Sequence, residues 1–280
     1  MRDIRQTQEY ANYLKKEGWI VERIKDTNYF IRKLPLIGSL LKIQRPEKIN
    51  FGTINKLCRK YCVFQIILEP RLTASNSTKY HNLLISHGFK LSKSPYLPSK
   101  TLQINLTKPL VFDKETRRCI RMGDRVKIRE CSSIFDVKEF HSAWKKSVKF
   151  TRFVPSLKSL INLQNSFSIH KPIILVSHNK SGSLIGGVIF TRSLHDYTYY
   201  WQGFTNNEGR TSLSQYSLVY QGILWAKEVG CKVFDFEGIF DKRFPNKSWL
   251  GFTHFKKSFG GHEVSYPGCY TKLRFPYFDK

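Results

Sequence analysis

Two segments near the end of the chain combine charged, aromatic and glycine residues at spacings that could support chemistry. The first, Trp225–Gly238, ends in Asp-Phe-Glu-Gly. The second, residues 251–261, contains Lys256 between Phe255 and Phe259 and closes with two glycines. Because glycine lets the backbone approach a ligand closely, we predict a tight turn that presents the Lys256 cation beside apolar walls. This setting favours a chemical function for Lys256 over a purely structural one.

The elements that position these residues follow from the pattern before them. Apolar residues between Leu213 and Leu224 recur at helical spacing, and Gly230 is suited to end the helix. The β-prone run 232–236 comes next, so Asp235 stands at the end of a strand. Asp235 is therefore either a catalytic acid or a cap for the following loop.

The rest of the chain predicts two similar sets of elements. In the first half we expect helices over 6–16, 53–61 and 81–87 and strands over 29–33, 40–44, 63–68 and 101–106. In the second half we expect a helix containing Phe140 and Trp144, a hairpin of 173–177 with 184–191, and a strand over 197–202. Strands, then a helix, then a strand, twice over, indicate two mixed α/β units packed side by side.

The charge of the chain points to a polyanionic partner. The 280 residues contain 47 Lys and Arg against 21 Asp and Glu, a formal net charge of +26. Nucleic acid, an anionic membrane surface and a diphosphate-bearing substrate all offer phosphates to these cations. A generally basic proteome is the alternative explanation.

Other signals exclude several classes of function. The chain has no Gly-x-x-x-x-Gly-Lys-Ser loop, no Gly-x-Gly-x-x-Gly and no His-Glu-x-x-His, which disfavours kinase, dehydrogenase and zincin chemistry. The six cysteines are scattered, so we expect reduced and mostly buried thiols and no metal site. No apolar run approaches the roughly 20 residues of a membrane span, so we expect a cytoplasmic protein, at most peripheral to a membrane.

A basic helix is expected over residues 114–121. Its spacing places Arg117 and Arg121 on one face, with Lys114 and Arg118 alongside. This face could grip phosphates, and an ordinary solvated face explains it equally well.

Short motifs in a specific order cover nearly the whole chain. They are Gln6-Thr-Gln-Glu-Tyr-Ala11, Ile43-Gln-Arg-Pro46, Glu69-Pro70, residues 98–106, residues 116–121, Trp225-Ala-Lys with Asp235-Phe-Glu-Gly238, and Phe255-Lys-Lys-Ser-Phe-Gly260. In this order the chain resembles the Fem family of peptidoglycan bridge-forming aminoacyltransferases. The resemblance implies two tandem GNAT-like domains, each a mixed β-sheet flanked by helices. We expect them at 1–128 and 129–262, with a strand in 263–280 returning to the first.

The resemblance also implies a reaction. Fem proteins move an amino acid from aminoacyl-tRNA to the stem-peptide amine of a peptidoglycan precursor, either lipid II or UDP-MurNAc-pentapeptide. No cofactor is expected beyond the aminoacyl-tRNA co-substrate. The sequence agrees, because the strand over 184–191 is not followed by the glycine-rich loop that cradles pyrophosphate in ordinary acetyltransferases.

Roles for individual residues follow from the motifs of this family. Lys256 and Phe255 are expected beside the reacting ester, and Glu69 at the edge of the acceptor cleft, where it would orient or deprotonate the amine. Arg152 corresponds to an arginine that binds the precursor's diphosphate. Further substrate contacts are expected from Arg45, Arg210, Tyr216 and Asp235. The expected tRNA contacts are Lys114, Arg117, Arg118, Arg121 and Lys257.

The chain also departs from the family. Asn12 stands where one branch has a diphosphate-binding lysine, Phe234 replaces a tyrosine, and the coiled-coil arm of some members is absent. Two alternatives remain open at this point: a GNAT-like N-acyltransferase that uses acyl-CoA, and a non-catalytic basic RNA-binding protein.

Overall fold

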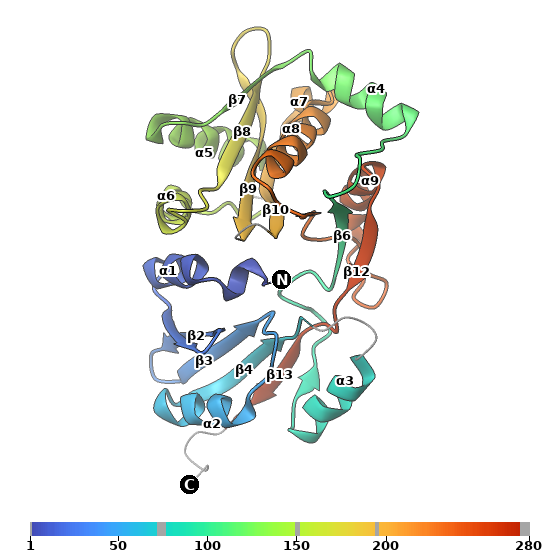
Figure 1. Cartoon of the computed structure of the whole chain (residues 1–280). Coiled ribbons are helices and arrows are strands. Elements are labelled where there is room, and N and C mark those ends of the chain that lie inside the picture. Colours follow the sequence, from blue (N-terminus) through green and yellow to red (C-terminus); the bar gives the residue numbers. More distant parts are fainter. Residues whose placement is uncertain (1, 72–76, 149–151, 194–195, 275–280) are drawn as a thin grey trace. The chain divides into compact units, whose positions relative to one another are not determined.

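A computed structural model describes residues 2–71, 77–148, 152–193 and 196–274. They form two compact units. The first unit comprises Arg2–Thr101, Gly238–Leu250 and the described residues after His262. The second unit comprises Leu102–Glu237 and Gly251–His262. Each unit contains a mixed β-sheet with helices packed on it, which confirms the expected α/β fold class (Figure 1).

The first sheet has six strands in the order β1-β2-β3-β4-β13-β5. Only β3 and β4 are parallel among its pairs, and α2 makes the crossover between them. The strands are β1 (Ile20–Ile24), β2 (Thr27–Leu34), β3 (Gly38–Gln44), β4 (Val63–Glu69), β5 (Lys90–Leu91) and β13 (Tyr270–Leu273). The helices are η1 (Ile4–Gln6), α1 (Gln8–Lys16), α2 (Phe51–Lys60), α3 (Ser77–Ser86) and η3 (Lys247–Trp249).

Alternation along β2 and β3 gives this sheet two covered faces. Ile31 and Leu41 share one buried cluster with Ile54 of α2. Phe30 points to the opposite face, where its ring lies 5.8 Å from that of Tyr10 on α1. Figure 1 accordingly shows α1 and α2 on opposite faces of the sheet.

The second sheet has seven strands in the order β12-β6-β11-β10-β9-β8-β7. In this sheet β10 and β11 are parallel and are joined by α8. The strands are β6 (Lys100–Asn105), β7 (Lys127–Glu130), β8 (Ile173–His178), β9 (Leu184–Ser193), β10 (Tyr197–Thr205), β11 (Val233–Asp235) and β12 (His262–Ser265). The helices are α4 (Lys114–Gly123), α5 (Ile134–Val148), α6 (Leu157–Ser166), α7 (Asn207–Thr211), α8 (Ser214–Glu228) and α9 (Leu250–Ser258).

The two sheets repeat one arrangement. In the first, the hairpin β2-β3 leads through α2 to β4, and in the second, the hairpin β9-β10 leads through α8 to β11. In both cases the helix returns the chain to a strand parallel to the second strand of the hairpin. The similarity of the halves, inferred from element order alone, therefore extends to strand pairing.

Each sheet also takes in a strand from the other end of the sequence. We expected residues 101–106 to complete the first set, but β6 pairs antiparallel with β11 in the second sheet. Conversely, β13 pairs antiparallel with β4 and β5 in the first. Residues 102–128, expected in the first domain, accordingly group with the second unit. Residues 275–280 of the expected returning segment lie outside the described residues.

The core of the second unit is tight where α8 crosses the sheet. A Cβ atom on Gly222 of α8 would lie 2.3 Å from Cζ of Phe190 on β9. On the other face, a Cβ on Gly187 would lie 2.8 Å from the ring of Phe140 on α5. Since real Cβ atoms do not approach other atoms this closely, both glycines are needed for the helices to reach the sheet.

We therefore predict that Gly222→Ala destabilises the protein by about 1–3 kcal/mol, because the added methyl group overpacks the core against Phe190. Denaturant unfolding would measure the change. Gly251→Ala is the matched control, since nothing lies within 4 Å of its added Cβ on α9. Helix propensity alone should make this control neutral or more stable by up to ~1 kcal/mol. Equal losses in the two variants would contradict the packing argument.

Candidate active site

Lys256 lies on a helix, and the tight turn expected around it is wrong. Residues Leu250–Ser258 form α9, and Gly260 and Gly261 follow the helix with φ angles of +76° and +95°. The reason is the aromatic spacing: the rings of Phe255 and Phe259, one helical turn apart, meet edge to face at 5.5 Å. The two glycines end the helix and do not surround the lysine.

The half-buried Lys256 ammonium is held by two groups. Its Nζ donates a hydrogen bond to the backbone carbonyl of Phe236, 2.8 Å away. It also lies 5.4 Å from the centre of the Tyr200 ring, within the range of a cation–π interaction. Phe236 follows β11 and Tyr200 lies on β10, so the parallel pair of strands supplies both contacts.

This environment changes the acidity of Lys256. Burial lowers the pKa of Lys256 from its ordinary value of 10.5 to about 8, because it penalises the charged form. The carboxylates of Glu237 and Asp235 act in the opposite direction, and the Arg152 guanidinium lowers the pKa further. Lysine 256 is thus a cation that can lose its proton near neutral pH, as groups at reaction centres often can.

Aromatic rings form the wall beside this cation. The ring of Tyr216 on α8 meets Phe255 edge to face at 5.0 Å and stacks on Phe259 at 5.5 Å. The Tyr200 hydroxyl accepts a hydrogen bond from the Gln215 amide at 2.8 Å, and burial raises the pKa of Tyr200 to about 12. The structure therefore brings Lys256, Phe255 and Tyr216 together, and it adds Tyr200, which sequence reasoning missed.

Asp235 caps the turn after β11, which is one of the two roles that the sequence left open for it. Its side chain is 4% exposed. One oxygen accepts from the Gln103 amide on β6 at 2.8 Å, and the other accepts from the backbone N–H of Glu237 at 2.7 Å. A buried carboxylate held in this way stabilises the turn.

Glu237 is a second residue that the sequence motifs did not single out. It is half-buried and has a φ of +67°, a left-handed conformation that is unusual for glutamate. Its carboxylate is one of the two that raise the pKa of Lys256. The signal was present in Asp-Phe-Glu-Gly, where an acidic residue directly precedes glycine after a strand.

The two arginines expected in this unit occupy different settings. Arg152 is exposed, its guanidinium lies 5.0 Å from the centre of the Phe252 ring, and its charge acts on Lys256. Arg210 is also exposed, but it donates to the carbonyl of Thr205 and to Asn207 within its own turn. Of the two, Arg152 is placed with the Lys256 cluster.

Glu69 and Arg45 belong to the first unit, where both are buried. Glu69 is 1% exposed and accepts from the Leu97 backbone N–H at 2.6 Å and from the Gln44 amide at 3.1 Å. Arg45 is 4% exposed, donates to the carbonyls of Pro70 and Pro98, and lies 3.6 Å from the Tyr266 ring centre. These contacts hold neighbouring backbone segments together, and the substrate roles expected for both residues stay predictions.

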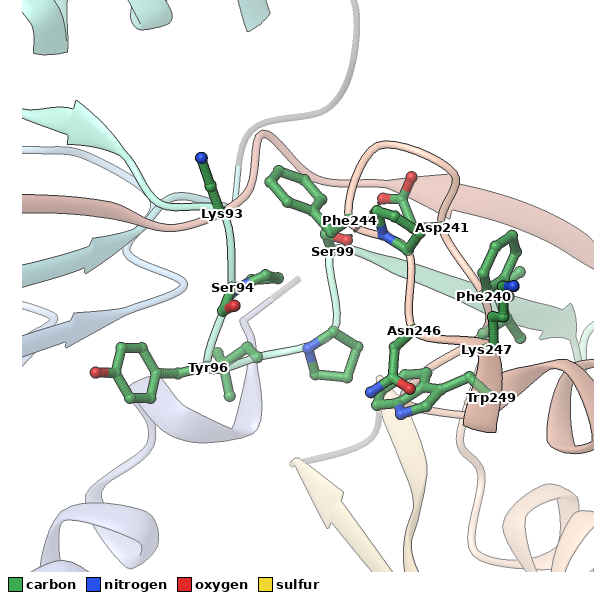
Figure 2. Close-up of a pocket in the computed structure, with 15 residues that line it drawn as sticks. Lys93, Ser94, Tyr96, Ser99, Phe240, Asp241, Phe244, Asn246, Lys247 and Trp249 are labelled. Atoms are coloured by element: carbon green, nitrogen blue, oxygen red, sulfur yellow. Dashed lines mark hydrogen bonds between the residues drawn. The ribbon is translucent and has the colours of Figure 1, made fainter.

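The first unit also contains a pocket of about 370 Å³, drawn in Figure 2. Its walls combine the rings of Tyr96, Phe240, Phe244 and Trp249 with the amide of Asn246. Its carboxylate, Asp241, accepts hydrogen bonds from Ser99 and Arg243. The lining thus offers apolar surface, an amide and the ammonium groups of Lys93 and Lys247, a combination that suits ligand binding.

The expected basic face is present on α4. Lys114, Arg117, Arg118 and Arg121 are all exposed, and Lys257 is exposed on α9. The opposite side of α4 is buried, and Thr116 there donates to the carbonyl of Ser258 at 2.8 Å. Arg118 already pairs with Glu115, which leaves three cations of this helix for a ligand.

Three findings concern metal sites, membrane spans and cysteines. Within the described part of the chain, no group of three or more His, Cys, Asp or Glu side chains could hold a metal ion. No helix in that part is long and apolar enough to cross a membrane. The six cysteines are free, and all except Cys62 are buried, as expected.

Comparison with known proteins was made by sequence and by structure. No family model and no curated protein matches the chain. The crystal structure of FemX matches it with a TM-score of 0.79 at 15% identity, over 97% of this chain and 92% of FemX. The chain has the fold of FemX. The resemblance seen in the sequence is thereby confirmed at the level of fold.

Two other solved structures show a weaker likeness than FemX. One is the C-terminal domain, from Agrobacterium fabrum, of a protein described as a lysylphosphatidylglycerol synthetase, with TM-score 0.63, 10% identity, and 97% and 89% of the two chains covered. The other is a tandem GNAT protein from the clavulanic acid pathway, with TM-score 0.53, 8% identity, and 88% and 78% covered. The tandem GNAT match agrees with the repeated arrangement of the two sheets.

The connection that could hold a pyrophosphate lies later in the chain than expected. The strand predicted over 184–191 is β9, which pairs antiparallel with β10, and the connection from strand to helix follows β10. That connection contains Gly209, where a Cβ would lie 2.4 Å from the Ile185 carbonyl oxygen. The glycine therefore lets the turn pack against β9, and it is not part of a glycine-rich run.

The lowered pKa of Lys256 can be measured directly. We predict that one lysine side-chain NMR signal titrates near pH 8, protonated below that pH and neutral above it, because burial penalises the cation. Lys256→Arg should remove that signal, which assigns it. The prediction is wrong if every lysine signal titrates near the ordinary value of 10.5.

Proposed function

We propose that the protein is an aminoacyltransferase that moves an amino acid from aminoacyl-tRNA to the stem-peptide amine of a peptidoglycan precursor. The observation that carries the proposal is the half-buried Lys256 ammonium, fixed against the Phe236 carbonyl beside the rings of Phe255 and Tyr216. The FemX fold over 97% of the chain supports the same reaction class.

The chemistry of ester aminolysis suits this cation. When an amine attacks the ester carbon, negative charge develops on the carbonyl oxygen and then on the departing ribose hydroxyl oxygen. A preorganised ammonium stabilises that charge without reorganising during the reaction. Lys256 is the residue to which we assign this role, and transfer is direct, without an acyl group bound to the protein.

The donor we propose is aminoacyl-tRNA. The net charge of +26 and the exposed cations of α4 suit a polyphosphate. The packing role of Gly209 after β10 supports a donor other than acyl-CoA, because coenzyme A would need its pyrophosphate cradled near that helix. No cofactor takes part in the proposed reaction.

The acceptor we propose is lipid II or UDP-MurNAc-pentapeptide, bound at the inner face of the membrane or in the cytoplasm. Arg152 is the proposed diphosphate contact, because its exposed guanidinium lies within electrostatic reach of Lys256.

The deciding experiment incubates the protein with tRNA charged with a radiolabelled amino-acid mixture and with each of three acceptors. These are lipid II, UDP-MurNAc-pentapeptide and phosphatidylglycerol vesicles. Label on either precursor supports the proposal and identifies the amino acid. Label on phosphatidylglycerol alone, acyl-CoA-dependent transfer, or tRNA binding without any transfer would each replace it with the corresponding alternative.

We predict that Lys256→Met lowers kcat by about 100-fold or more, because the oxyanion loses its preorganised cation. Folding should change little, as thermal unfolding would show. Arg152→Ala should raise KM for the precursor and leave kcat nearly unchanged. A Lys256→Met variant with normal turnover would remove this lysine from the mechanism.

A second prediction concerns the basic face of α4. Reversing Lys114, Arg117 and Arg121 to Glu should weaken tRNA binding and reduce the slope of log K against log salt by about 2 to 3, one phosphate contact being lost per residue. Reversing the exposed Lys171, Lys180 and Lys227 of the same unit changes the net charge equally. A similar loss of slope in both triple variants would show that the face has no special role.

A further inference from the structure

The peptide unit between Phe236 and Glu237 is held from both sides. Its carbonyl oxygen accepts the hydrogen bond from Lys256 at 2.8 Å, and its N–H donates to Asp235 at 2.7 Å. Asp235 is itself fixed by the Gln103 amide. Glu237 therefore begins at the peptide whose carbonyl binds the Lys256 ammonium, and its carboxylate acts electrostatically on that ammonium.

The backbone of Glu237 is in a conformation that glutamate rarely adopts. Its φ of +67° belongs to the left-handed region, where glycine or asparagine is the usual choice. A strained residue at a site persists only when its surroundings fix it, and such residues gather where function needs them. Here the hydrogen bonds of the Phe236–Glu237 peptide fix the backbone, and the residue in this strained conformation is an acid.

Asp235 and Glu69 are more deeply buried than Glu237. Both oxygens of Asp235 accept hydrogen bonds inside the turn, and its side chain is 4% exposed. Both oxygens of Glu69 likewise accept hydrogen bonds within the first unit, where Glu69 is 1% exposed. Glu237 is half-buried and so retains surface that a substrate can reach.

We propose that Glu237 is the catalytic base, and this rests on the proposed function. The acceptor arrives as an ammonium and can attack only after it loses a proton. The Glu237 carboxylate takes that proton, the amine nitrogen forms a bond to the ester carbon, and the bond from that carbon to the ribose oxygen breaks. The ribose oxygen leaves with a proton from the attacking nitrogen. The net products are an amide, the free ribose hydroxyl and one proton released to water.

Glu237 and Lys256 would then interact with groups of opposite charge in the same reaction. The carboxylate binds the positive nucleophile, and the ammonium stabilises the negative oxygen of the tetrahedral intermediate. Their proximity also keeps Lys256 protonated, because the carboxylate favours the charged form.

The test compares wild type with Glu237→Gln, which keeps the size and turn of the side chain and removes its basicity. Two acceptors are used: the natural precursor amine, and a precursor analogue whose attacking nitrogen is an aminooxy group, uncharged at neutral pH. We expect the variant to lose about 100-fold or more in kcat with the amine. With the aminooxy acceptor the loss should be only a few-fold, because no proton has to be removed before attack.

Two further variants make the comparison specific. Glu237→Asp retains a carboxylate and tolerates the left-handed conformation, so it should recover part of the amine-dependent rate. Glu208→Gln is the matched control, since Glu208 is exposed and pairs with Asn179 on the same unit. This control should leave both rates unchanged.

The outcomes separate the two proposals. If the wild-type protein transfers no amino acid, the proposed function and this inference are both overturned. If it does, equal losses of rate with both acceptors in Glu237→Gln would show a structural role and overturn the inference alone. A donor with an acetylated α-amine provides the last arm: if acetylation slows wild type but not the variant, Glu237 binds the donor's ammonium and is not the base.

Discussion

The Phe236–Glu237 peptide after β11 is the constraint on which the candidate site depends. A peptide group has one donor and one acceptor, and here a buried acid takes the donor while a half-buried lysine takes the acceptor. Burying either charged group costs free energy. Hydrogen bonds from the peptide and the neighbouring residues offset that cost. The aromatic wall then excludes water from one side of the lysine, which lowers its pKa.

The position of this peptide also depends on a residue from the first half of the sequence. Asp235 is fixed by Gln103, and the two residues are direct partners in the antiparallel register of β6 and β11. Had β6 stayed in the first sheet, as its position in the chain suggested, Asp235 would lack this amide. The exchange of strands between the sheets therefore also serves the geometry of the site.

The sequence predicted the regular elements well, because helical and alternating apolar spacing is a local property. The hairpin of β8 and β9, the helix α8 and the strand β11 all lie within a few residues of their expected ranges. Strand partners were predicted less well, since the sheet that accepts β6 depends on contacts distant in sequence. The glycines near Lys256 were interpreted as a turn around the lysine. The structure has a helix there instead, and the rings of Phe255 and Phe259, one helical turn apart, contact each other. Burial was harder to predict: the motifs do not show that Arg45 and Glu69 are almost fully buried, because burial depends on packing between segments distant in sequence.

The position of β13 in the first sheet determines when that sheet can form during synthesis. This strand lies between β4 and β5, so the first sheet lacks an inner strand until residues 270–273 have left the ribosome. During synthesis β4 would present an unpaired edge, the kind of surface that recruits other strands and leads to aggregation. The N-terminal unit thus begins to emerge first but can complete its sheet only after residues 270–273 have been made.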